Sequence, residues 1–239
     1  MEQTVEQPTA TPLTEHKRLY EALYSLPESI LSASGRFLYS DISSLRPGKF
    51  YLLGYNPGGD PGKIITPLRD EISKWGTTNT NAYLDEVWRH SPQAGGSPYQ
   101  RNVRELCDAL GICPRDVCAS NLFFTRSISA AALKVGKENP FWPVHEVVLD
   151  IVMPECILAI GLNTYSTIAR LLEFNEKRTF HSGHGTWYCR VAEGQYRNRS
   201  LKLIGFPHFS RYSLKGRVNV LAQIAEECSR SGRKNGNHP

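Results

Sequence analysis

The sequence predicts a single α/β domain of three layers, α/β/α, built around a central, mostly parallel sheet of four strands. Three observations favour this fold class. Short apolar segments, typical of strands buried on both faces of a sheet, recur at wide intervals along the chain. Amphipathic helical segments lie between them, which implies a parallel sheet covered on both sides. The chain has 239 residues, enough for one domain with a sizeable core but not for two.

Four segments have the composition of buried strands. Each is rich in β-branched, aromatic or other apolar residues and is bounded by turn residues. They are KFYLLGY (49–55), DVCASNLFF (116–124), CILAIGL (156–162) and LKLIGF (201–206). A further segment, HSGHGTWYCRV (181–191), predicts a turn that leads into an added strand at the edge of the sheet.

Five segments have helical periodicity. They are EHKRLYEALYSL (15–26), YQRNVRELCDALGI (99–112), FWPVHEVVLDIVM (141–153), NTYSTIARLLEF (163–174) and VNVLAQIAEECSR (218–230). The connection 59–98 is long for a compact domain, and we expect it to hold short helices. Loops of this length are usually functional or mobile. We expect the domain to span residues 16–229, between a disordered segment, 1–15, and a flexible basic tail, 230–239.

The composition excludes several classes of protein. No apolar run approaches the length of a membrane span, and the N-terminus lacks the pattern of a signal peptide, so we expect a cytoplasmic protein without a membrane partner. The six cysteines are scattered with no C-x-x-C pair, which suits reduced thiols. The chain has no nucleotide-binding glycine motif, no nucleophile elbow and no metal-spaced His/Cys set, so no cofactor and no metal are predicted. The net charge of +5 alone is weak support for a nucleic-acid partner.

The chemistry is expected at the carboxyl ends of the strands, where open parallel sheets bind ligands. The first strand runs into a tight turn in FYLLGYNPGGDPG (50–62), with Asn56 at the exit of the strand. One interpretation is a loop of good turn formers. The other is that the small residues let a ligand approach the backbone while the Asn56 side chain holds a group in place.

Two other strand ends carry polar side chains. Asn121 ends the second strand, where its amide must find partners because an unpaired buried polar group costs about 1–3 kcal/mol. Its donor and acceptor match the edge of a pyrimidine, although local backbone partners are an equal alternative. The fourth strand is followed by GFPHFSRYSLKGR (205–217), in which His208 could stabilise an oxyanion and the Ser, Arg and Lys residues are of phosphate-contacting types. A solvated basic loop with a helix-capping histidine is the alternative.

Taken together and in this order, these turns resemble the motifs of the uracil-DNA glycosylase superfamily. The first motif of that family, Gly-x-Asn/Asp-Pro-Gly/Tyr after a strand, is matched by GYNPG (54–58), and the last motif, His-Pro-Ser or a variant, by HFS (208–210). The segments LGI…DVCASNLFFTR and ILAIGLNTYSTIARLL are similar to its middle strands. The resemblance covers residues 20–225.

The resemblance implies a role for each matched residue. Asn56 would position the water that attacks the sugar C1′, acting by orientation because a neutral amide is a poor base. His208 would stabilise charge on O2 of the departing base, and Asn121 would read the edge of a pyrimidine flipped out of the DNA. We expect the substrate to contact Gly54, Tyr55, Pro57, Gly58, Leu68 and Asn121. We expect DNA to contact Ser210, Arg211, Tyr212, Ser213, Lys215 and Arg217, with Arg211 and Tyr212 as wedge residues.

Three positions depart from the family pattern. Phe209 stands where proline is usual, and GKIITPLRDEI (62–72) lacks the phenylalanine that stacks on the base, so Leu68 or an aromatic from Trp75 to Trp88 must serve. Gly58 stands where strict uracil enzymes carry a bulky aromatic that excludes a 5-substituent. A roomier pocket is therefore expected, open to 5-hydroxymethyl or larger sugar-bearing pyrimidines of the kind found in phage DNA.

The sequence thus predicts a monomeric, monofunctional DNA glycosylase that hydrolyses the N-glycosidic bond of uracil or a 5-modified pyrimidine, in DNA repair or in defence against phage. The main alternative is a DNA-binding protein on the same fold that has lost the chemistry. A third alternative is an enzyme of free nucleosides, for which the basic loop after His208 would have no purpose.

Overall fold

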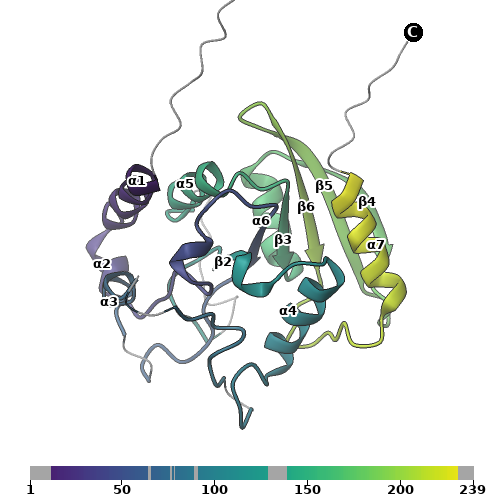
Figure 1. The fold of residues 1–239 in the computed structure, drawn as a ribbon, viewed down its shortest axis with the longest axis horizontal. Helices are drawn as coiled ribbons and strands as arrows, with labels where there is room; N and C mark the ends of the chain where they lie inside the picture. Colours follow the sequence, from purple (N-terminus) through teal and green to yellow (C-terminus); the bar gives the residue numbers. More distant parts are fainter. Residues whose placement is uncertain are drawn as a thin grey trace, which may run out of the picture.

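The computed structural model describes residues 12–63, 66–75, 77, 79–88, 91–128 and 139–230 (Figure 1). The described residues form one central sheet of six strands in the order β2-β1-β3-β6-β5-β4. Most of the two predicted tails, residues 1–11 and 231–239, lies outside the described residues. The strands are β1 (Phe50–Gly54), β2 (Cys118–Asn121), β3 (Cys156–Ile160), β4 (Asn175–His181), β5 (Tyr188–Tyr196) and β6 (Arg199–Phe206).

The four predicted strands are the parallel part of the sheet. Strands β2, β1, β3 and β6 pair side by side in parallel, so their carboxyl ends lie at the same edge, which faces down in Figure 1. The predicted number of strands is wrong, because β4 and β5 add an antiparallel hairpin beside β6. The strand after the HSGHGTWYCRV turn is β5, which is not at the edge. The edge strand is β4, whose sequence NEKRTFH buries only Phe180 and therefore lacks an apolar strand pattern.

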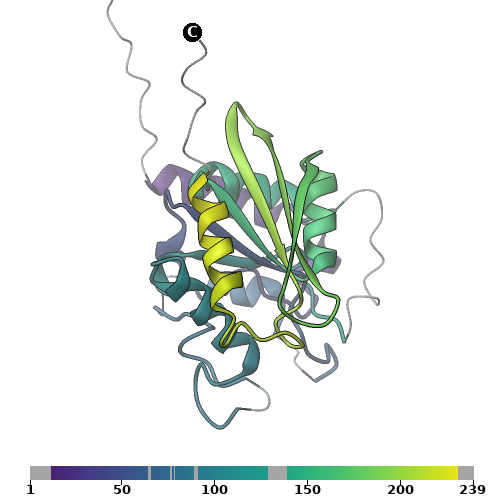
Figure 2. The ribbon, with the colours of Figure 1, turned by 90° about the vertical axis from the view of Figure 1, so that its right-hand side faces the viewer.

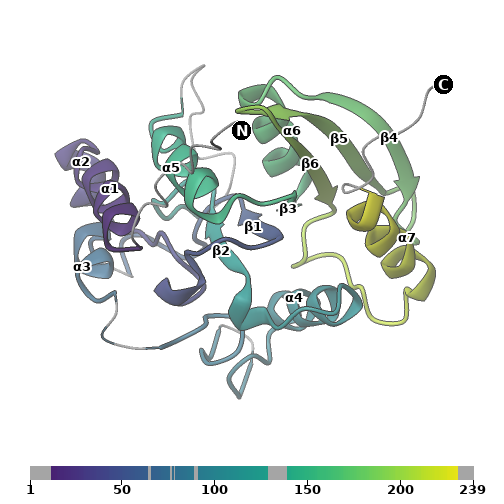
Figure 3. The same cartoon turned by 45° about the horizontal axis from the view of Figure 1, so that its top comes forward.

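Helices cover both faces of the sheet and give the three predicted layers. Alternate residues of β1 point to opposite faces, so Tyr51 and Leu53 enter one core and Phe50 and Leu52 the other. Figure 3 shows α5 and α6 on one side of the strands and α4 and α7 on the other. The helices are α1 (Pro12–Tyr24), α2 (Glu28–Leu31), α3 (Leu68–Ser73), α4 (Pro98–Ala109), α5 (Trp142–Val152), α6 (Leu162–Leu171) and α7 (Val218–Ser229), with short 3₁₀ turns η1 (Ile42–Ser44) and η2 (Pro114–Asp116).

The five predicted helical segments form α1, α4, α5, α6 and α7. Helix α1 begins at Pro12, inside the segment expected to be disordered, and α3 is a short helix of the expected kind in the long connection. The start of α4 is fixed by a capping box, in which the Ser97 side chain accepts from the Gln100 amide while the Gln100 side chain accepts from the Ser97 amide. No described helix is long and apolar enough to cross a membrane.

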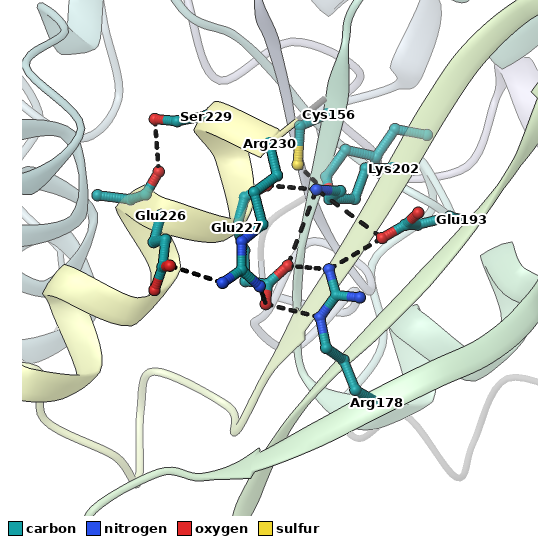
Figure 4. A network of polar contacts seen from close by, with 10 residues as sticks. Cys156, Arg178, Glu193, Lys202, Glu226, Glu227, Ser229 and Arg230 are labelled. Carbon is teal, nitrogen blue, oxygen red and sulfur yellow. Dashed lines mark hydrogen bonds and ion pairs between the residues drawn. The ribbon is translucent and has the colours of Figure 1, made fainter. Parts of the chain in front are cut away.

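A buried network of charges fixes the added hairpin to α7 (Figure 4). Lys202 of β6 and Glu227 of α7 are 4% and 2% exposed, and the Lys202 ammonium donates to the Glu227 carbonyl. Arg178 of β4 donates to the Glu227 carboxylate and, over 2.9 Å, to Glu193 of β5. Buried charges are tolerated when each is paired, and these pairs join all three strands to the helix. The hairpin is therefore a fixed part of the domain.

Candidate active site

The carboxyl ends of the four parallel strands lie at one edge of the sheet, so the turns that follow them are brought to the same side of the domain. Gly54 and Asn121, the last residues of β1 and β2, are partners in the sheet register. On the other side, the Gly161 amide, after β3, donates to the Phe206 carbonyl of β6 over 2.9 Å. Gly161 has a left-handed φ of 96°, and a Cβ there would lie 3.3 Å from Cδ2 of His208. The His208 ring therefore packs over the end of β3.

The amide of Asn56 has a defined orientation. Its Nδ2 donates to the Pro57 carbonyl and to Ser127 Oγ, both over 2.9 Å. A carbonyl oxygen can only accept, so the atom facing Pro57 must be the nitrogen. Both amide donors are thereby used within the protein, which leaves Oδ1 as the group that can accept a hydrogen bond from a water or a ligand.

Asn121 lies across the end of β1 and is 5% exposed. A Cβ at Gly54 would lie only 2.1 Å from Asn121 Oδ1 and 3.1 Å from the Tyr99 hydroxyl, so residue 54 must be glycine. Burial raises the pKa of Tyr39, which lies beside the Asn121 side chain. The role of Asn121 in reading a base stays a prediction.

His208 is held as a neutral imidazole. The Ser210 amide donates to its Nδ1 over 3.3 Å, and Ser210 Oγ lies 2.8 Å from the same atom. A backbone N–H always donates, so Nδ1 carries no proton and the ring proton sits on Nε2. His208 is exposed as a residue, but partial withdrawal of its ring from water, followed by the positive charge of Arg211, lowers the pKa of His208 below its usual range. At neutral pH the ring therefore offers an uncharged Nε2–H donor at the strand ends.

The loop after His208 is fixed by Asn102, a residue that the sequence analysis did not single out. From α4, Asn102 Nδ2 donates to the carbonyls of Phe209 and Tyr212 over 3.0 and 2.6 Å. Asn102 Oδ1 accepts from the Leu214 amide over 2.8 Å. Phe209, where the family has proline, is fully buried and packs against Tyr99. These contacts give the loop one conformation without proline.

The burial of two residues contradicts their predicted contacts with DNA or the base. Tyr212 is 3% exposed and its hydroxyl donates to the Ser182 carbonyl, so it anchors the loop and cannot act as a wedge. Leu68 is fully buried at the start of α3, so it has no surface to offer to a base. Trp75 packs against Tyr20 and Phe37 on the core side.

The remaining aromatic candidates differ in exposure. Tyr83 is 2% exposed, stacked between Tyr39 and Tyr99. Trp88 is half-buried and donates to Glu86. Tyr55, directly before Asn56, is also half-buried. Tyr55 and Trp88 therefore retain surface for stacking, as does Tyr99, which is also half-buried and whose ring lies 5.7 Å from that of His208.

The predicted phosphate-contacting residues are mostly on the surface. Ser210, Arg211, Ser213 and Lys215 are exposed. Arg217 is half-buried, and its guanidinium donates to the carbonyls of Ser213 and Gly183. Arg217 contributes positive charge to this surface, while its hydrogen bonds are used inside the protein.

Gly58 faces open space. No atom lies within 4 Å of a Cβ built at this position, and it is Gly59, not Gly58, that has a left-handed φ, of 110°. The Gly58 carbonyl accepts from Arg126 Nη1 over 2.8 Å. Arg126 Nε is buried and has no hydrogen-bond partner among the described residues. Arg126 is thus a second residue missed at the sequence level, and the backbone at Gly58 would accept a side chain.

Other features of the molecule do not compete with this site. Within the described ranges, no group of three His, Cys, Asp or Glu side chains is placed to hold a metal ion. A shallow hollow of about 340 Å³ lies at the opposite end of the sheet, beside Arg46, Lys49 and Asp116. A comparison with models of protein families finds no match, and no curated protein sequence matches the chain.

Proposed function

We propose that the protein is a monofunctional DNA glycosylase that hydrolyses the N-glycosidic bond of uracil or a 5-modified pyrimidine and leaves an abasic site. The observation that carries the proposal is the pair formed by Asn56 and His208. An amide with both donors occupied follows β1, and a neutral imidazole with a fixed Nε2–H follows β6, at the same carboxyl edge of the sheet and separated by the one strand β3. Such a pair offers an acceptor for a water and a donor for a departing anion.

The two side chains divide the reaction between them. Asn56 Oδ1 accepts a hydrogen bond from the attacking water and orients its lone pair towards C1′. The C1′–N1 bond breaks and its electron pair leaves with the pyrimidine, whose O2 becomes more negative. His208 Nε2–H stabilises that charge without transferring its proton, because a fixed dipole needs no reorganisation. The water loses its proton to solvent as the new C1′–O bond forms.

Gly58 and Arg126 suggest the substrate. The open space at Gly58 accepts a group on carbon 5 of the base, and Arg126, whose Nη1 donates to the Gly58 carbonyl, supplies positive charge beside it. The base must be flipped out of the helix to reach this edge of the protein. Arg211 is the exposed residue best placed to occupy the gap, while Ser210, Ser213 and Lys215 contact phosphates.

The proposal is tested with purified protein and oligonucleotides that contain one uracil or one 5-hydroxymethyl pyrimidine. The wild-type protein should create alkali-sensitive abasic sites without added metal. Asn56→Ala and His208→Ala should each lower the rate by at least about a hundredfold, the usual size for a general acid–base or oxyanion-type group. Asn175→Ala, an exposed change at the opposite end of the sheet, is the matched control and should keep full activity. Full rates in both site variants would overturn the assigned roles.

One observation favours the second candidate, a non-catalytic DNA-binding protein. Asn121, which should read the base, is only 5% exposed, so little of its surface is accessible to a ligand. Salt-sensitive DNA binding with no base released from any uracil or 5-modified substrate would establish this alternative.

A further inference from the structure

The added β4–β5 hairpin places a turn with exposed aromatic side chains beside the candidate active site. Trp187 is 36% exposed and Tyr188 is 46% exposed, on residues next to each other in the chain. Figure 2 shows this turn, in green, next to the yellow loop between β6 and α7. Large exposed apolar side chains promote association, so their position next to a candidate site indicates a binding role.

The turn is held in one conformation by its own hydrogen bonds. The Ser182 amide donates to the Trp187 carbonyl, and the Trp187 amide donates to the His184 carbonyl. The Gly183 amide donates to His181 Nδ1 over 3.0 Å. The rings of His184 and Trp187 lie 4.7 Å apart. A ring that is already fixed loses little conformational entropy when a ligand stacks on it.

Contacts with the loop after His208 make the two segments one surface. Tyr212 donates to the Ser182 carbonyl, and Arg217 donates to the Gly183 carbonyl. The Arg217 guanidinium also lies 3.3 Å from His184 Nδ1 and stacks over the Tyr212 ring at 5.1 Å.

The charge of this surface selects its ligand. Residues 181–188 and 207–217 contain no Asp or Glu, and the second segment carries Arg211, Lys215 and Arg217. Aromatic rings next to positive charge are what single-stranded nucleic acid binds, by stacking of bases and neutralisation of phosphates. In a duplex the bases are stacked inside the helix and are not free to stack on these aromatic rings.

We propose that the surface formed by Trp187, His184 and the loop 207–217 binds unpaired nucleotides that adjoin the reacting one. This inference rests on the proposed function for its place beside the site, and it adds that the nucleic acid is held in single-stranded or locally opened form. Trp187 is the principal stacking residue, with the His184 ring against it.

The test measures binding of a single-stranded oligodeoxyadenosine, which contains no pyrimidine to cleave, and of the duplex that this strand forms with oligodeoxythymidine. Trp187→Ala should raise the Kd for the single strand by about 5- to 100-fold, the range for loss of one base-stacking residue, and change the duplex Kd by less than about twofold. Trp187→Phe should give an intermediate loss and abolish most of the quenching of tryptophan fluorescence by the oligomer. Tyr24→Ala, which removes an equally exposed ring from the end of α1, is the control.

Two outcomes overturn the inference. One is unchanged single-strand binding by Trp187→Ala and by the double variant with His184→Ala. The other is an equal loss of single-strand and duplex binding in variants that keep the wild-type circular dichroism. Failure of the proposed function is distinguishable: Trp187-dependent binding with no base released from any DNA leaves this surface in place and removes the glycosylase.

Discussion

The three hydrogen bonds of Asn102 give the sharpest test of how the loop after His208 is held. Asn102→Ala leaves the carbonyls of Phe209 and Tyr212 and the amide of Leu214 without their buried partner. At about 1 kcal/mol for each lost bond, the free energy of unfolding should fall by about 3 kcal/mol. For a domain of this size that lowers Tm by roughly 6–12 °C. Urea unfolding followed by circular dichroism measures the loss.

The same variant should slow base release, because the loop that carries His208 loses its fixed conformation. The control is Ser44→Ala, which removes one buried and one partly buried hydrogen-bond contact at the amino end of the sheet and should cost stability without a specific loss of activity. Asn102→Asp separates the two kinds of hydrogen bond. It keeps an oxygen that accepts from the Leu214 amide, but it replaces the amide donor with a carboxylate oxygen that faces the carbonyls of Phe209 and Tyr212. A change below about 0.5 kcal/mol in Asn102→Ala, or Asn102→Asp as stable as the wild type, would refute this reasoning.

Three further predictions concern protons and substrate choice. Burial lowers the pKa of His145 from 6.5 to about 4, so the unfolded chain binds the extra proton and stability present above pH 6.5 is lost as the pH falls towards 4. Urea unfolding at pH 7.5 and 4.5 measures this fall in the free energy of unfolding, which should be smaller by about 3 kcal/mol in His145→Gln than in the wild type. Equal falls in both proteins would contradict the prediction. Arg211→Ala removes a positive charge that lowers the pKa of His208, so the pKa measured by NMR and the acid limb of base release should both move to higher pH; an unmoved titration argues against the contact. Gly58→Tyr should suppress release of a 5-substituted base more than release of uracil, because a steric wall acts only on the larger substrate, and equal loss on both would mean that residue 58 does not select.

The parallel core of the fold could be predicted because its strands lie within short, mostly apolar segments that are bounded by turns and separated by helical patterns. β1 is FYLLG with every residue buried, a pattern that few other structures produce. β4 was missed because it lies at the edge, where NEKRTFH has one buried side chain and reads as a polar loop. A strand that is stabilised by ion pairs such as Arg178–Glu227 leaves no apolar signature in its own sequence.

The predicted site was right about which strand ends meet, since parallel strands align their carboxyl ends whatever the loops do. It was wrong about side chains whose burial depends on distant partners. Tyr212 is oriented by Ser182, 30 residues away, and Leu68 by the core beneath α3. Asn102 could not be identified because its partners lie 107 to 112 residues later in the chain. Turn residues and motifs carry no information about such contacts.

Mass spectrometry of the bases released from ordinary, uracil-containing and 5-hydroxymethylated DNA tests the central claim most directly. The account predicts a free pyrimidine, released from the uracil-containing or 5-modified DNA by the wild-type protein and by Asn175→Ala, but not by Asn56→Ala. Release of no base from any of the three DNAs, or the same release from Asn56→Ala as from the wild type, would contradict it.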